Sequence, residues 1–423
     1  MRRLAIVLLS NLVVAASACA APPPLVVETD PLRPEEERKL FHLPPGFEIE
    51  LIVADPDIGQ PMNMNFDVHG RLWLTHVLEY PYPARGEGVE PRDARFPQVG
   101  EHEARDKLSV IENVGTPQQK ITHFATGLNI PIGNMPTPNG AIVFSIPDLW
   151  FCPDADGDLK ANSREELLYG RFGNIDTHGM VSSLNRWIDG WIYATHGFRN
   201  TSHVKGRDGH EFTMNSGNTF RFKEDGSHIE QFTWGQVNPF GLTFDPWGNA
   251  YTADCHSMPL TGLIRGAYYS SFGKPHDGLG FGPDMIDHIH GSTGICGAQW
   301  YAGEQFPEEY RGCIFLCNPV NGLVHRDRIE FHGSSPWVVT QPEFISCDDG
   351  WFRPVATSSS GRMARCTSPT STTASSATTK CRWTTPAAVA TRAASGRSRT
   401  AAMRRTPIRR PRCQTSRSLT SRN

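Results

Sequence analysis

One pattern recurs along the chain: an apolar strand, a short turn that ends at or near glycine, and a second apolar strand. The copies span residues 65–74, 138–143, 184–193, 242–251 and 310–315. The turn glycines are Gly70, Gly140, Gly190, Gly248 and Gly312. Their spacing of roughly 50–70 residues suits a four-stranded blade with its loops. The repeat therefore predicts an all-β chain built from blades, a β-propeller.

The last part of the chain has a different composition from the rest. Residues 356–423 contain no Asp, Glu, Phe or Tyr, but fourteen Lys plus Arg. The whole chain has 41 basic and 44 acidic residues, so the remainder has 27 against 44, a net charge of −17. One interpretation is a disordered basic tail that binds nucleic acid or an anionic surface.

A shift of reading frame near Val355 explains the tail better. With GC-rich codons, reading the third base of each codon with the first two of the next converts residues 362–371 into Pro-Asp-Gly-Ala-Leu-Tyr-Val-Ala-Asp-Phe. The recovered text is a turn followed by an alternating strand, the same pattern as in the body. Its glycine falls at position 364 and completes a set of six turns.

The fold class predicted is therefore a six-bladed β-propeller whose sixth blade is lost to a frameshift. The expected organisation is a signal peptide at 1–20, a linker at 21–40, the propeller at 41–355 and an out-of-frame, disordered tail at 356–423. A β-sandwich with accidental internal similarity is the alternative, although a sandwich does not require a motif at near-constant spacing.

The first residues read as a secretion signal. Arg2 and Arg3 precede an apolar stretch at 4–16, and Ala16-Ser17-Ala18 is a small-residue cleavage site. Cys19 follows directly and would allow lipidation, and with it attachment to a membrane. We therefore expect a periplasmic or secreted protein, which would be a lipoprotein if Cys19 is lipidated.

In a propeller, the segments just before each innermost strand converge around the central channel, where loops on a rigid scaffold carry chemistry. The candidates at these positions are polar residues: Gln60, Asn129, His178, Asn238 and Arg353. The alternative for each is that Asn, Gly and Pro only shape the tight entry into a strand.

Residues 154–165 have the spacing of a calcium loop. Oxygen ligands would come from Asp154, Asp156, Asp158, the Lys160 carbonyl, Asn162 and Glu165. Calcium prefers such a cluster of oxygen ligands at short range. Leu159 stands where glycine is expected, and the flanks are not helical. The alternative is an acidic, solvated turn.

Four stretches carry a resemblance to a known family. They are residues 41–49, the loop at 154–165, residues 241–249 and residues 306–312. The chain from Phe41 to Pro354 resembles the bacterial membrane-bound dehydrogenase domain family, whose propeller is similar to glucose/sorbosone dehydrogenases. Those enzymes hold pyrroloquinoline quinone over the channel, with calcium polarising it and a histidine taking the substrate's hydroxyl proton.

The resemblance implies a role for two residues here. His178 looks like the catalytic base, and a histidine suits this role near neutral pH. Asn238 looks like the channel residue that contacts cofactor or metal. Val237 stands where that enzyme group carries an arginine, which departs from the family pattern.

The functional hypothesis is an exported, quinoprotein-like oxidoreductase acting on a small-molecule sugar or other alcohol, truncated by the frameshift. The first alternative is a calcium-dependent, lactonase-like hydrolase, and the second is a non-catalytic, ligand-binding propeller. Nucleic acid is not an expected partner, because no basic patch remains once the tail is set aside.

Overall fold

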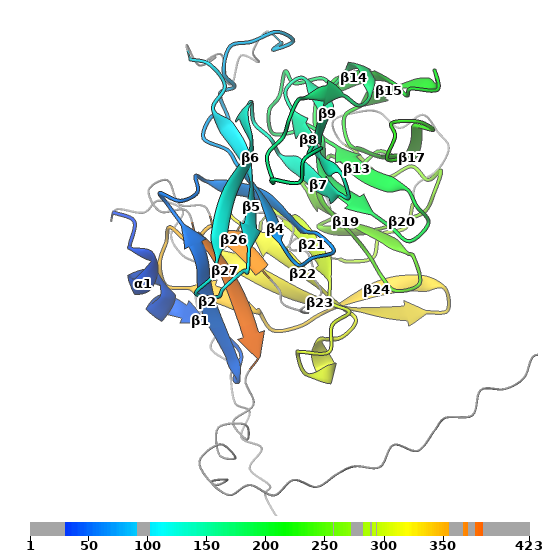
Figure 1. The fold of residues 1–423 in the computed structure, drawn as a ribbon. Coiled ribbons are helices and arrows are strands. Elements are labelled where there is room, and N and C mark those ends of the chain that lie inside the picture. Colours follow the sequence, from blue (N-terminus) through cyan, green and yellow to red (C-terminus); the bar gives the residue numbers. More distant parts are fainter. Residues whose placement is uncertain are drawn as a thin grey trace, which may run out of the picture. The chain divides into compact units, whose positions relative to one another are not determined.

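The computed structural model describes residues 30–90, 102–256, 258–271, 282–287, 290–292 and 294–354, together with the backbone of 367–370 and 377–383 (Figure 1). The predicted signal peptide, Cys19, position 364 and most of the tail lie outside the described residues. Within the described residues, no helix has the length and apolar character to cross a membrane.

Strands make up nearly all the regular structure of the described residues. The helices there are single turns: α1 (Pro34–Glu37), η1 (Arg38–Leu40) and η2 (Glu308–Tyr310). The first two lie in the segment that we expected to be a linker. Glu37 is buried there, and burial, followed by the nearby Asp349, raises the pKa of its carboxyl to about 7.

Three antiparallel sheets follow one another in chain order, each of four strands. The first has strands β3 (Pro61–Phe66), β4 (Leu72–His76), β5 (Asp106–Glu112) and β6 (Lys120–Leu128). The second has strands β7 (Gly133–Thr137), β8 (Gly140–Ser145), β9 (Asp148–Pro153) and β10 (Glu165–Glu166). The third has strands β12 (Ser182–Arg186), β13 (Ile192–His196), β16 (Asn218–Phe222) and β17 (Glu230–Trp234).

Two further sheets continue the series. One has strands β18 (Asn238–Phe244), β19 (Ala250–Cys255) and β20 (Leu260–Leu263). The other has β21 (Cys296–Trp300), β22 (Cys313–Asn318), β23 (Leu323–His332), β24 (Ser335–Thr340), β25 (Ile345–Cys347) and the early strand β1 (Phe41–His42). A separate sheet is formed by strands β11 (Tyr169–Arg171), β14 (Thr201–Lys205) and β15 (Glu211–Asn215). In the chain, β11 precedes the third sheet, and β14 and β15 lie between its strands β13 and β16.

The predicted turn glycines lie at the start of the second strand of each of these five sheets. All five have a positive φ, between +70° and +150°, which other residues rarely adopt. In three copies the turn also closes in the same way. Asp67 N–H donates to Arg71 O and Gly70 N–H to Asp67 O, just as Asp245 N–H donates to Asn249 O and Gly248 N–H to Asp245 O. In the third sheet, Trp187 N–H donates to Trp191 O and Gly190 N–H to Trp187 O. The sequence repeat is therefore a repeated turn structure.

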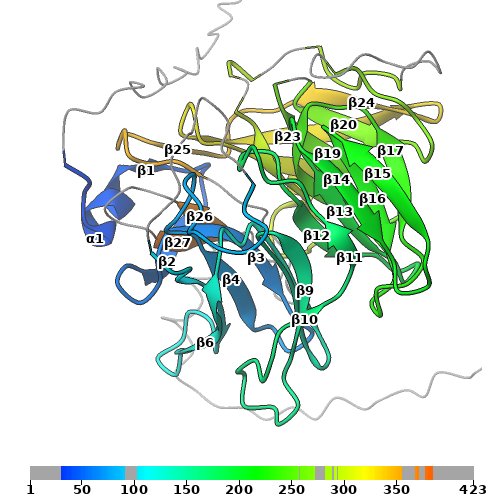
Figure 2. The ribbon, with the colours of Figure 1, turned by 90° about the horizontal axis from the view of Figure 1, so that it is seen from above.

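The sheets lie side by side, and their first strands contact one another in the order β3, β7, β12, β18 and β21 (Figure 2). Hydrophobic clusters fill the spaces between neighbouring sheets. Between the first two sheets, for example, Trp73 and Phe124 pack with Val143 and Cys152. All six cysteines in the body are free thiols, and five of them are buried.

One more sheet joins the two ends of the described chain. Strand β2 (Phe47–Ala54) pairs with β27 (Ala377–Trp383), which pairs with β26 (Thr367–Thr370). Phe47 and Ile49 pack against the β21–β25 sheet, while Ile52 and Val53 pack against the β3–β6 sheet. These two segments lie in the part of the chain that we expected to be a disordered tail, and they form strands beside β2.

Candidate functional site

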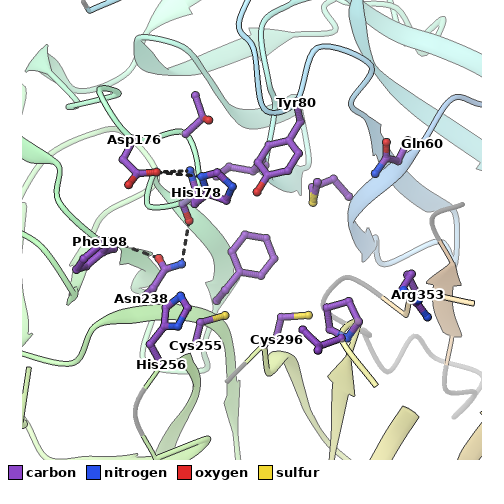
Figure 3. Close-up of a pocket in the computed structure, with 17 residues that line it drawn as sticks. Gln60, Tyr80, Asp176, His178, Phe198, Asn238, Cys255, His256, Cys296 and Arg353 are labelled. Atoms are coloured by element: carbon purple, nitrogen blue, oxygen red, sulfur yellow. Dashed lines mark hydrogen bonds and ion pairs between the residues drawn. The ribbon is translucent and has the colours of Figure 1, made fainter. Parts of the chain in front are cut away.

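A cavity of about 490 Å³ lies where the innermost strands begin (Figure 3). Its lining comes from five sheets and the loops between them. The lining residues are Gln60, Met62, Tyr80, Ile132, Asp176, Thr177, His178, Phe198, Asn238, Phe240, Cys255, His256, Gly294, Cys296, Pro319, Val320 and Arg353. Four of the five polar residues predicted for the channel, Gln60, His178, Asn238 and Arg353, are thus brought together.

His178 is held by a buried carboxylate. Its Nδ1 lies 3.0 Å from Asp176 Oδ1, and its backbone N–H donates to the same oxygen at 3.1 Å. The Asp176 side chain is 2% exposed and the His178 side chain 37%. A carboxylate at Nδ1 keeps the proton on that nitrogen and leaves Nε2 as the acceptor. The pair has the geometry of a general base and the group that orients it.

Asn238 fixes the backbone around this pair. Its side-chain N–H₂ donates to His178 O at 2.9 Å, and its Oδ1 accepts from Phe198 N–H at 3.3 Å. Its own backbone N–H donates to Asp254 Oδ1. The side chain therefore connects β18 to the loops that carry His178 and Phe198.

Tyr80 and His256 also line the cavity, and our sequence analysis did not identify either. The rings of Tyr80 and His178 meet edge to face, with centroids 5.3 Å apart. Burial raises the pKa of the Tyr80 phenol well above its ordinary value, and the nearby Cys255 and Asp176 raise it further. Burial, followed by the charge of His178, lowers the pKa of His256. His256 has φ +78°, a strained conformation for a residue with a side chain.

Gln60 and Arg353 lie across the cavity from His178 (Figure 3). Burial lowers the pKa of the Arg353 guanidinium, and the negative charge of the nearby Asp349 raises it by a smaller amount. Its Nη1 donates to Phe352 O at 3.0 Å. Arg353 is the one Lys or Arg among the described lining residues, so this end of the cavity suits an anionic group.

The thiols of Cys255 and Cys296 face the same cavity. Cys255 Sγ donates to Ile295 O at 2.9 Å, and burial raises the pKa of this thiol to about 12. A thiol with such a pKa stays protonated and is a poor nucleophile.

Asn129 is the predicted cofactor contact that the structure places elsewhere. Its side chain bonds both backbone groups of Ala84, accepting from N–H at 3.0 Å and donating to O at 2.9 Å. It is buried and does not line the cavity, because this pairing uses its amide to hold the loop that carries Tyr80. Val237 is also buried, and it lies outside the lining.

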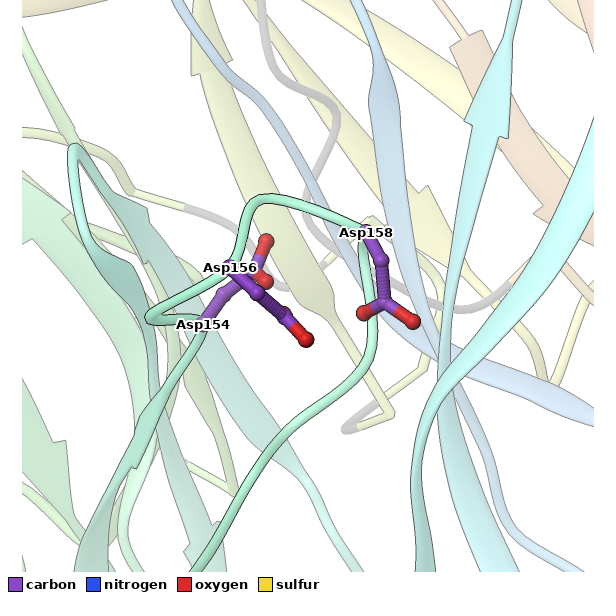
Figure 4. Close-up of side chains that lie close together, drawn as sticks. All are labelled: Asp154, Asp156 and Asp158. Carbon is purple, nitrogen blue, oxygen red and sulfur yellow. The ribbon is translucent and has the colours of Figure 1, made fainter.

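The acidic loop lies between β9 and β10, apart from the cavity lining (Figure 4). Asp154, Asp156 and Asp158 each offer a carboxylate oxygen within 4.8 Å of the others. Leu159 is buried against Trp73 and Phe124, which explains the leucine in place of glycine, and its φ of +63° still makes the turn.

The other predicted calcium ligands are engaged differently. Asn162 Oδ1 accepts from Ala155 N–H, which closes the loop. Glu165 begins β10 opposite Phe151. Lys160 N–H donates to Asp158 Oδ1, and its ammonium lies 4.0 Å from the same carboxylate. The structure thus gathers the first three predicted ligands and assigns Asn162 a role within the loop.

The comparisons with known proteins place this chain in a family. The family model of a domain of unknown function (DUF7133) matches residues 33–361. The chain belongs to this family. A comparison with curated proteins finds no match.

Solved structures that are similar to this member of the DUF7133 family include quinone-dependent sugar dehydrogenases. The holo PQQ domain of pyranose dehydrogenase from Coprinopsis cinerea is 12% identical, with a TM-score of 0.51 over 86% of this chain and 99% of that chain. The PQQ-bound aldose sugar dehydrogenase from Streptomyces coelicolor is 11% identical, with a TM-score of 0.49 over 81% and 99%. The apo-form aldose sugar dehydrogenase from Escherichia coli is 14% identical, with a TM-score of 0.46 over 79% and 99%.

At this identity the similarity concerns the fold. The prediction of an all-β, propeller-type chain like that of the sugar dehydrogenases is confirmed, while membrane association stays a prediction.

Proposed function

We propose that this DUF7133 protein is an exported oxidoreductase that acts on a sugar or other alcohol, with His178 as the base. The observation that carries the proposal is the Asp176–His178 pair, 3.0 Å apart, at the wall of a cavity of about 490 Å³. A cavity of this size accommodates a small molecule. The likeness in fold to the pyranose dehydrogenase domain supports the reaction class.

The residues of the cavity perform the first step. A substrate hydroxyl gives its proton to His178 Nε2, and the positive charge that forms on the imidazole is balanced by Asp176. Asn238 keeps His178 in place through the backbone carbonyl. Positioned bases of this kind contribute about 10²–10⁴-fold to a rate.

The described lining fits pyrroloquinoline quinone at one end. Arg353, a half-buried cation that faces the cavity, would hold a carboxylate, and Gln60 on the same side would offer an amide hydrogen bond. When bound, the quinone supplies the electron acceptor for alcohol oxidation. Because Val237 replaces the family's arginine, quinone binding would depend on Arg353.

The test is reduction of a redox dye by a panel of aldoses and polyols, with and without added quinone. We expect activity that requires quinone and is lost in His178→Ala, with His228→Ala, an exposed histidine, as the matched control. Calorimetry should show weaker quinone binding in Arg353→Met. Full turnover in His178→Ala would remove the histidine from the site. Calcium-dependent lactone cleavage without quinone would establish the hydrolase instead, and ligand binding without either activity would establish a binding protein.

Calcium binding is proposed for the acidic loop, where it would be structural. Besides the three carboxylates, Asp154 Oδ1 is buried and has no hydrogen-bond partner among the described residues, as expected for an oxygen reserved for a cation. We expect calcium to raise the melting temperature of the wild type and not that of Asp156→Asn, with Asp225→Asn as the control. An equal shift in both variants would locate the calcium elsewhere.

The six-bladed interpretation and the frameshift are proposed together. Among the described residues, two hydrophobic clusters hold β2 between the fifth and first sheets of the series. This is the position of a sixth blade, whose remaining strands would come from the true reading frame. Resequencing the codons for 350–365 tests this, and a single-base error there is the expected result. Relatives that continue in the same frame as this chain beyond residue 355 would contradict the proposal.

A further inference from the structure

We propose that Tyr80 is a second catalytic residue of the cavity, whose phenolic O–H donates a hydrogen bond to the substrate oxygen that loses its proton to His178. This inference rests on the proposed function. In the step, the substrate O–H bond breaks and an N–H bond forms at His178 Nε2. The electron pair stays on the oxygen, and Tyr80 keeps its own proton.

The first support for the inference is the position of the phenol. Tyr80 lines the cavity, and its hydroxyl points toward the middle, on the same side as His178 (Figure 3). The edge-to-face contact between the two rings, at 5.3 Å and 70°, places base and phenol beside the same space. The hydroxyl has no hydrogen-bond partner among the described residues, so it can donate to a ligand.

The state of the phenol agrees with a donor. Burial and the nearby Asp176 both disfavour the tyrosinate, so the pKa is raised and the group is a neutral O–H at physiological pH. A neutral donor aimed at an oxygen that gains negative charge stabilises that charge without a competing charge of its own.

The loop that carries Tyr80 is fixed on both sides, as preorganised catalysis requires. Leu78 N–H donates to Asp106 Oδ1 at 2.6 Å, and Ala84 is bonded by Asn129. Thr177 Oγ1 donates to Pro81 O at 2.8 Å, which ties this loop directly to the segment of Asp176 and His178. Base and donor therefore belong to one hydrogen-bonded unit.

The first test compares Tyr80→Phe with the wild type in the dye assay, with Tyr169→Phe, an exposed tyrosine, as the control. We expect kcat to fall about 100-fold to 1,000-fold, as for loss of one such donor, with KM nearly unchanged. A structural role would move the melting temperature and leave kcat of the folded variant intact. Unchanged kcat in Tyr80→Phe beside an inactive His178→Ala overturns the inference and leaves the proposed function standing.

The second test needs no turnover. The absorbance of tyrosinate is titrated in the full chain, and the Tyr80→Phe curve is subtracted from that of the wild type. We expect no ionisation of Tyr80 at the pH where free tyrosine ionises, near 10. Ionisation at that ordinary pH would show a solvated phenol and overturn the inference, whatever the activity of the protein.

Discussion

The side chain of Asp176 makes two hydrogen bonds with His178, because one carboxylate oxygen accepts both the ring N–H and the backbone N–H. The loop itself is held by Asn200, which donates to the carbonyls of Asp176 and Gly179 at 2.8 Å. Small errors in the placement of a base are costly, and this network restricts both the ring and its backbone.

Replacing Asp176 with Asn tests this at the residue scale. We expect kcat to fall at least 10-fold with KM nearly unchanged, because the amide cannot balance the imidazolium that forms when His178 takes the proton. Steady-state kinetics on folded protein measures the effect, and Asp225→Asn is the control. A variant with wild-type kcat would show that Asp176 only supports the fold.

The sequence reveals some of these residues and not others. His178 and Asn238 could be predicted because they lie at or just before the start of an innermost strand. Asp176, the partner of His178, was not predicted although it lies only two residues before it. Tyr80 and His256 have no such local signal. They reach the cavity from loops whose path depends on distant contacts, such as Asn129 with Ala84.

At the scale of the element, the repeated turns use their aspartates in the same way. Asp67 Oδ2 accepts from Trp73 Nε1, and Asp245 Oδ2 accepts from Tyr251 O–H, in each case an aromatic residue six positions later. This link fixes the second strand of the sheet against its own turn, so the strands of different sheets begin with the same geometry.

Strand β4 contains a histidine whose burial makes stability depend on pH. Burial lowers the pKa of His76 to about 3, and its Nε2 has no partner among the described residues. Above pH 6.5 both the folded and unfolded states have a neutral ring, so the free energy of unfolding is unaffected. Below it the unfolded chain binds a proton that the folded chain does not, so stability falls by about 1.4 kcal/mol per pH unit down to pH 3.

His76→Asn should therefore reduce the loss of stability between pH 6.5 and 3, since its amide oxygen can still accept from Gly59 N–H as Nδ1 does now. Urea denaturation at several pH values measures this, and the exposed His69→Asn serves as the control. Parallel pH curves for His76→Asn and the wild type would contradict the assignment.

Elements that were missed lacked the repeat. Strands β11, β14 and β15 form a sheet outside the series, and β14 alternates exposed and buried residues over only five positions. In the loop at 154–165, Asp154, Asp156 and Asp158 lie close together, and calcium binding there stays a prediction. The anchoring of this loop through Leu159 could not be foreseen, because Trp73 and Phe124 come from another sheet.

At the scale of the whole molecule, the cluster that packs against β2 contains a buried arginine. Arg326 is 9% exposed and stacks over the Tyr310 ring at 4.2 Å. Its Nε and Nη1 have no hydrogen-bond partner among the described residues. Tyr310 belongs to the cluster that packs against β2. Within the described part of the chain no carboxylate pairs with this buried cation, which is unfavourable; under the proposed frameshift, the sixth blade would supply the partner.

Arg326→Met should consequently stabilise this chain by about 1 kcal/mol or more, because it removes the charge and retains the apolar stem. Thermal and urea unfolding measure the change, and the exposed Arg311→Met is the control. A large loss of stability in Arg326→Met would indicate that the guanidinium is paired. In a chain with the restored frame, we expect the same substitution to destabilise.

Strands β2 and β27 pair although they are synthesised far apart in time. Residue 54 and residue 377 lie in one sheet, 323 positions apart in the chain. At about 5–20 residues per second, some 16–65 seconds of translation separate the two partners. During that time β2 has an open edge, and an open edge invites pairing with other chains. Strand β2 must therefore wait for a partner strand that begins 323 residues after β2 ends.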